Sequence, residues 1–97
     1  MPITLRPRQR ARLKARAHAL EPIVQIGQAG ATEKVTAEVD RSLTAHGLIK
    51  VKLAGDRDAR DALATTLAAR TDAAIVQQVG RIVVLWRPRP DDEPIED

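Results

Sequence analysis

The chain has 97 residues, no cysteine, 43% hydrophobic and 30% charged residues, and a formal net charge of +3 at pH 7. This length and balance suit one small folded domain and exclude a multidomain machine and a disordered chain. Without cysteine there is no disulfide framework, thiolate nucleophile or cysteine zinc site, and no apolar stretch is long enough to span a membrane.

Charge is distributed unevenly along the chain. Residues 91–97 carry five acidic side chains and no basic one, so residues 1–90 hold 16 basic against 8 acidic groups. Such an excess of positive charge in a small folded unit indicates a polyanionic partner, either nucleic acid or an anionic membrane surface. Trp86 is the only aromatic residue, which disfavours modules that stack bases on aromatic side chains.

The first expected element is a helix from Arg6 to about Ala19. Leu13, Ala17 and Leu20 fall on one apolar stripe of this helix. Arg6 precedes Pro7 and is a poor N-cap, so we expect a weakly capped first turn. Basic side chains repeat at i and i+4 on both margins of the stripe, although like charges at this spacing repel. They are Arg6, Arg10 and Lys14 on one margin and Arg8, Arg12 and Arg16 on the other.

Alternating strand and helix signals fill the middle of the chain. A strand at residues 23–26 leads into a loop at 27–30 and a helix that Thr32 caps and that runs to about His46. Gly47 ends this helix, and the strand at 48–53 places Lys50 and Lys52 on one face.

The last part of the chain predicts a helix and a hairpin. Asp56 is the expected N-cap of the helix, which ends near residues 70–72 and whose apolar stripe is Ala59, Leu63 and Leu67. Strands at 74–79 and 82–86 are joined by a glycine and an arginine, which suits a type II′ turn. The second of these strands is apolar throughout, so we expect it to lie centrally or to be covered on both faces.

This order of elements predicts an α/β domain over residues 4–90, with an α+β two-layer arrangement and a small four-stranded mixed sheet. Two right-handed crossovers would make the first three strands parallel, and the hairpin adds one antiparallel strand. Residues 91–97 are expected to form a disordered acidic tail.

The loop Gly27-Gln28-Ala29-Gly30 lies where a strand meets a helix. Two glycines let the backbone turn sharply and expose N–H groups at the positive end of the helix dipole, where a phosphate binds well. The two residues between them leave room for a sugar-phosphate backbone, as in the GXXG loop of KH domains. The same pattern is common in ordinary turns, so the loop alone is a weak signal.

Three separated segments closely resemble the YhbY family, the bacterial stand-alone form of the CRM RNA-binding domain. They are L-K-A-R-A-H-A-L-E-P-I-V-Q-I-G-Q-A-G-A-T-E from Leu13, L-I-K-V-K-L from Leu48 and V-G-R-I-V-V-L-W-R-P from Val79. The resemblance covers about residues 5–90. It implies an α-β-α-β-α-β-β fold similar to the C-terminal domain of translation initiation factor three, and association with precursors of the large ribosomal subunit. It also implies RNA contact through the loop Gly27 to Gly30, beside the basic first helix.

The expected RNA-binding residues come from the first helix, the glycine loop and one strand face. They are Arg8, Arg10, Arg12, Lys14, Arg16, His18, Gly27, Gln28, Ala29, Gly30, Lys50 and Lys52.

Other interpretations of several polar residues stay open. Lys50 and Lys52 suit a solvated sheet face equally well, and Arg87 and Arg89 either add charge toward the nucleic acid or offset the acidic tail. His18 and His46 lie near helix C-termini, where capping is the simpler interpretation. We expect no catalytic residue, no metal ligand and no cofactor, because two isolated histidines lack any metal-binding spacing.

We therefore predict a cytoplasmic RNA-binding protein that is not an enzyme. It would recognise ribosomal RNA by phosphate and shape and assist assembly of the large ribosomal subunit, with no small-molecule substrate and no membrane partner. A DNA-binding or nucleoid module is an alternative, because a positive helix does not distinguish the two nucleic acids. A small ribonuclease with His18 or His46 as general base and a protein-interaction adaptor on the ribosome are further alternatives.

Overall fold

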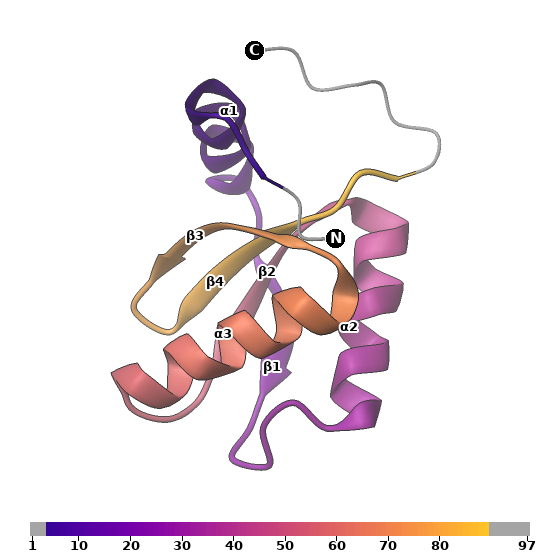
Figure 1. Cartoon of the computed structure of the whole chain (residues 1–97), viewed down its shortest axis with the longest axis vertical. Coiled ribbons are helices and arrows are strands. Elements are labelled where there is room, and N and C mark those ends of the chain that lie inside the picture. The colour runs from indigo at the N-terminus through magenta and orange to yellow at the C-terminus, as the bar shows by residue number, and fades with distance from the viewer. Residues whose placement is uncertain (1–3, 90–97) are drawn as a thin grey trace.

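Within residues 4–89, which the computed structural model describes, three helices and four strands follow one another in the predicted order (Figure 1). They are α1 (Pro7–Ala17), β1 (Pro22–Ile26), α2 (Glu33–His46), β2 (Leu48–Leu53), α3 (Arg57–Thr71), β3 (Ala74–Val79) and β4 (Ile82–Trp86). The acidic tail expected at residues 91–97 lies outside the described residues.

The four strands form one mixed sheet in the order β1-β2-β4-β3. β1 and β2 are parallel, and β4 is antiparallel to both of its neighbours, so β1, β2 and β3 share one direction as predicted. β4 lies between β2 and β3, and its residues Val83, Val84 and Leu85 are buried. The expectation that this apolar strand is central is confirmed.

The helices lie on both faces of the sheet. The larger core is formed by α2, α3 and one sheet face, with Leu43, Leu67 and Leu85 among its buried residues. On the other face, Leu13 and Ala17 of α1 pack with residues of β2, β3 and β4. The two-layer expectation is therefore wrong in one respect: α1 adds a partial third layer, because the apolar central strand has to be covered on both faces.

Local capping signals fix the helix ends. Thr32 Oγ1 and Asp56 Oδ1 each accept a hydrogen bond from the backbone N–H three residues further on, at 3.2 and 2.9 Å. α1 is capped differently from the expectation for Arg6: the backbone N–H of Arg6 donates to Oε1 of Gln9 at 2.9 Å. The side chain of Gln9 thus satisfies one of the free N–H groups at the start of the helix, as in the return bond of a capping box.

The buried stripe of α3 differs from the predicted one. Leu67 is buried as expected, but Ala59 is exposed and Leu63 is only half-buried. Ala64, Ala68 and Thr71 are buried beside Leu67. α3 therefore packs on the larger core through Leu67 and the small residues of its second half, and Leu63 packs against the same core while partly exposed.

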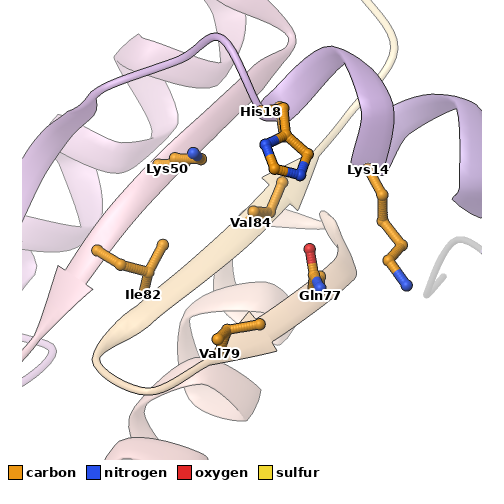
Figure 2. A pocket seen from close by; sticks show the side chains of 8 residues that line it. Lys14, His18, Lys50, Gln77, Val79, Ile82 and Val84 are labelled. Carbon is orange, nitrogen blue, oxygen red and sulfur yellow. The ribbon is translucent and has the colours of Figure 1, made fainter.

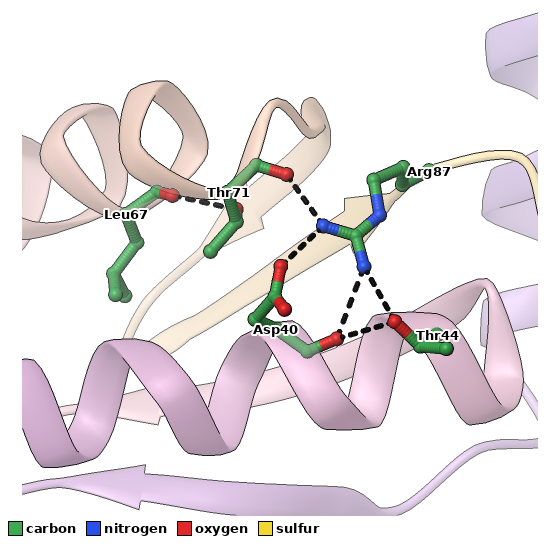
Figure 3. Close-up of polar contacts among 5 residues, drawn as sticks. All are labelled: Asp40, Thr44, Leu67, Thr71 and Arg87. Atoms are coloured by element: carbon green, nitrogen blue, oxygen red, sulfur yellow. Dashed lines mark hydrogen bonds and ion pairs between the residues drawn. The ribbon is translucent and has the colours of Figure 1, made fainter.

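Arg87 joins the end of β4 to the two helices of the larger core (Figure 3). Its Nη1 donates to Oδ1 of Asp40 at 2.6 Å and to the carbonyl oxygen of Thr71 at 2.7 Å. Its Nη2 donates to the carbonyl oxygen of Asp40 at 3.0 Å and to Oγ1 of Thr44 at 2.9 Å. This arginine therefore fastens α2 and α3 to the sheet, a role that neither sequence interpretation anticipated.

We expect the substitution Arg87→Met to lower the free energy of unfolding by about 1.5 to 3 kcal/mol, because it leaves the part-buried carbonyl group of Thr71 without a charged donor. Asp40→Asn should cost less than about 1 kcal/mol, because the carboxylate is 55% exposed and its ion pair is screened by solvent. Urea unfolding followed by the fluorescence of Trp86 measures both. Equal losses in the two variants would contradict the assignment.

Candidate nucleic-acid interface

α1 presents a one-signed surface to solvent. The helix contains no acidic residue, and Leu13 and Ala17 alone among its side chains are buried. The predicted contacts Arg8, Arg12, Lys14 and Arg16 are all exposed. The charged side chains on the outward face of α1 are therefore all cationic.

Arg10 is placed differently from the other predicted contacts of α1. It is half-buried, and its Nη1 donates to the carbonyl oxygens of Ile75 at 2.6 Å and Val76 at 2.7 Å. These carbonyls belong to the edge strand β3 at a register shift between Ile75 and Gln77, which is a β-bulge. Arg10 thus ties α1 to the bulge, and its contact with RNA stays a prediction.

Three predicted contacts gather around a groove of about 370 Å³ between α1 and the sheet, the α1-side groove (Figure 2). They are Lys14, His18 and Lys50. His18 is also the C-cap residue of α1. Lys52 continues the same sheet face, exposed and paired in register with Gln25 of β1. Lysines of β2 therefore extend the cationic surface of α1 across the sheet.

The remaining lining of the α1-side groove was not predicted from the sequence. It includes Gln77 and Val79 of β3 and Ile82 and Val84 of β4. The bulge breaks the alternation of β3, so the face on which Gln77 lies cannot be read from its position in the sequence.

The glycine loop is a closed turn at the end of β1. The N–H of Gly30 donates to the carbonyl oxygen of Gly27 at 3.1 Å, so the amide of Gly30 is not exposed in the way the sequence predicts. Within the described part of the chain, the amides of Gln28 and Ala29 have no hydrogen-bond partner. These two amides are therefore available to donate hydrogen bonds to a ligand.

The backbone conformation requires glycine at only one of the two glycine positions of the loop. Gly30 has φ of +76°, and a Cβ there would lie 3.4 Å from Cδ2 of Leu63, so its backbone conformation is strained for any other residue. Gly27 has no positive φ, and no atom of residues 4–89 lies within 4 Å of the position its Cβ would occupy. The fold does not require glycine at position 27, and the space beside it is open.

The glycine loop does not lie beside α1, so this expectation is wrong. Figure 1 places α1 and the loop between β1 and α2 at opposite ends of the molecule, whose longest extent is 37 Å. The cause is strand direction. α1 packs on Leu48 at the start of β2, whereas the loop follows Ile26, which pairs with Leu53 at the end of that parallel strand. The sheet face with Lys50 and Lys52 lies between them.

A second groove, of about 300 Å³, holds His46 together with Arg16 and Glu21. His18 and His46 therefore line different grooves.

Among residues 4–89, no group of three or more histidine, aspartate and glutamate side chains could hold a metal ion, and no helix has the length and apolar composition to cross a membrane.

Residues 5–87 match the family model of the CRS1/YhbY (CRM) domain. The chain therefore belongs to the CRS1/YhbY (CRM) family, and the resemblance carried by the three sequence segments is confirmed.

Similar proteins cover nearly the whole chain. A Haemophilus influenzae protein named as an RNA-binding protein is 45% identical over 86 residues, which are 88% of this chain and 87% of the relative. A Pseudomonas aeruginosa protein, named as a probable RNA-binding protein, is 38% identical and covers 91% of this chain and 86% of its own length. The solution structure of the hypothetical protein SAV1595 from Staphylococcus aureus, which is described as a candidate RNA-binding protein, matches with a TM-score of 0.83. It is 33% identical and the match covers 96% of this chain and 98% of that one.

We expect Arg10→Ala to lower the free energy of unfolding by about 1 to 3 kcal/mol, because the edge carbonyls of β3 lose a charged donor. Arg8→Ala removes the same charge from the exposed face of α1 and should change stability by less than about 0.5 kcal/mol. Thermal unfolding monitored by circular dichroism compares the two. If both variants unfold like the wild-type protein, the anchoring role of Arg10 is wrong.

Proposed function

We propose that this protein binds RNA through α1 and the adjoining lysine face of β2. The observation that carries the proposal is the separation of charge between the layers of the fold. Of the eight acidic residues in the described chain, seven belong to α2 or α3 or cap them; they are Glu33, Glu38, Asp40, Asp56, Asp58, Asp61 and Asp72. α1 and the four strands contain none.

The geometry of β2 suits a phosphate backbone. Lys50 and Lys52 are two residues apart on one strand, a separation of about 7 Å. Two ammonium groups at this separation can contact neighbouring phosphates of one strand, while Lys14 and the arginines of α1 hold the backbone beyond the α1-side groove.

The glycine loop is a second contact in this proposal. Because it lies at the far end of the sheet from α1, it would bind a different part of the same RNA. The exposed amides of Gln28 and Ala29 and the open space beside Gly27 support this role.

Ribosomal RNA in precursors of the large subunit is the RNA that we propose, together with a cytoplasmic location and a role in ribosome assembly. The resemblance of three segments to the YhbY family supports this partner. Sedimentation of a cell extract followed by detection of the protein tests it: the protein should travel with precursors of the large subunit, and a protein found only at the top of the gradient would count against it.

The lysine face is tested by the salt dependence of RNA binding. Lys52→Gln should weaken binding of a ribosomal RNA fragment and lower the slope of log affinity against log salt by about 0.7 to 1, the share of one phosphate contact. Arg41→Gln removes an equal charge from the exposed side of α2 and should leave the slope unchanged. Fluorescence anisotropy over a salt series measures both slopes, and identical behaviour of the two variants would exclude the lysine face.

The loop is tested by adding negative charge to it. The double variant Gln28→Asp with Ala29→Asp should reduce RNA retention in an electrophoretic shift assay, because carboxylates repel phosphates. Thr65→Asp with Ala69→Asp adds the same charge on the exposed side of α3 and is the matched control. Retention that falls equally in both would mean that net charge, not the loop, is responsible.

The same assay separates the alternatives. Duplex DNA that displaces the RNA at equal concentration and salt would favour a DNA-binding module. Cleavage of the RNA by the wild-type protein would favour a ribonuclease if the RNA stays intact with His18→Ala or His46→Ala.

A further inference from the structure

The α1-side groove combines an apolar floor with a cationic rim (Figure 2). Val79, Ile82 and Val84 supply aliphatic surface, and Lys14 and Lys50 stand at its edges. Val79 is 60% exposed, although β-branched side chains in a sheet are usually covered. Among residues 4–89 no acidic side chain lines the groove, so an anionic ligand with an apolar part fits it better than an ion alone.

Gln77 brings a free amide to this groove. It pairs in register with Val84, and Val79 pairs with Ile82, so these side chains share the face that α1 covers. Gln78, the next residue, faces the other way and donates to Asp61 of α3 at 2.8 Å. The side-chain amide of Gln77 is half-buried and makes no hydrogen bond to any residue within 4–89.

The β-bulge is what gives Gln77 this direction. Val76 is buried beneath α1 in the smaller core, and the register shift between Ile75 and Gln77 lets the next side chain stay on the same face. Arg10 fastens the bulge through the carbonyl oxygens of Ile75 and Val76. The backbone from which Gln77 projects is thus fixed by the contact that docks α1.

We propose that the α1-side groove holds one unstacked nucleotide of a single-stranded RNA. The base lies against Val79, Ile82 and Val84, the amide of Gln77 hydrogen-bonds the edge of the base, and Lys14 and Lys50 hold the neighbouring phosphates. This inference rests on the proposed RNA binding and narrows it to RNA with at least one exposed base.

The volume and the lining side chains of the α1-side groove suit the binding of one nucleotide. A volume of about 370 Å³ is at the lower end of the range for small-molecule sites. An amide offers a donor and an acceptor side by side, which matches the paired donor and acceptor on the edge of a base. Bases in an RNA helix are paired and stacked, so only an unpaired base can reach the groove. Because Trp86 is not among the lining residues, the base packs on aliphatic side chains and is not stacked on an aromatic ring.

The test titrates isotope-labelled protein with oligoadenylate, oligouridylate and a duplex RNA of the same length, observed by NMR. With the single strands, the side-chain amide of Gln77 and the methyl groups of Val79 and Ile82 should shift. Gln77→Leu should weaken binding of single strands about 2- to 10-fold, the worth of one hydrogen bond. Thr65→Leu is the control, because Thr65 is exposed on α3, which packs on the opposite face of the sheet; its affinity should equal that of the wild-type protein.

The outcomes separate this inference from the proposed function. If single strands bind but the groove signals do not move, or if Gln77→Leu binds like the control Thr65→Leu, the nucleotide site is wrong and RNA binding stands. Binding of the duplex alone overturns the nucleotide site in the same way. If the wild-type protein binds none of the three RNAs, RNA binding by this surface fails, and the nucleotide site fails with it.

Discussion

The docking of α1 on one half of a sheet face is the interaction on which the candidate interface depends. Like-charged pairs at i and i+4 along α1 each cost a few tenths of a kcal/mol. Burial of one leucine side chain contributes about 1.5 to 3 kcal/mol, so the packing of Leu13 alone offsets several such pairs. The short apolar stripe also limits what α1 covers: it buries Leu48 and Val84 and leaves Lys52 exposed. The same contact therefore concentrates positive charge and keeps the adjoining lysine face open.

Separation of α1 from the glycine loop changes how RNA can be held. A single cleft between them is excluded, because the strands of the sheet lie between the two (Figure 1). An RNA that touches both α1 and the glycine loop has to cross the face that carries Lys50 and Lys52. Its contacts with the protein are therefore spread along the molecule. Spread phosphate contacts release many counterions but read little sequence. Discrimination between RNAs would then come from shape and from the α1-side groove.

Element order and boundaries could be predicted from the sequence because the signals are local. Thr32 and Asp56 cap their helices with their own side chains, and Gly80 has the positive φ of 57° that a type II′ turn requires at its first central residue. The face chosen by α1, the buried side of α3 and the distance from α1 to the glycine loop depend on contacts far apart in the chain. For the candidate site, the sequence shows which residues are cationic, but it does not predict which of them form hydrogen bonds within the fold. Arg10 and Arg87 bond to carbonyl groups 65 and 16 residues away, and no local pattern marks such partners.

The arrangement of acidic residues explains why a net charge of only +3 is compatible with an RNA-binding face. In the layer formed by α2 and α3, carboxylates serve as caps and partners: Asp56 caps α3, Asp40 pairs with Arg87, and Asp61 accepts from Gln78. Each of these tasks fixes an acid on the side of the sheet away from α1. α1 and β2 themselves carry no acidic residue, so the charged side chains of these two elements are all cationic. Charge separation by layer thus follows in part from how the helical core is capped and fastened, and phosphates are groups that can balance the opposite face.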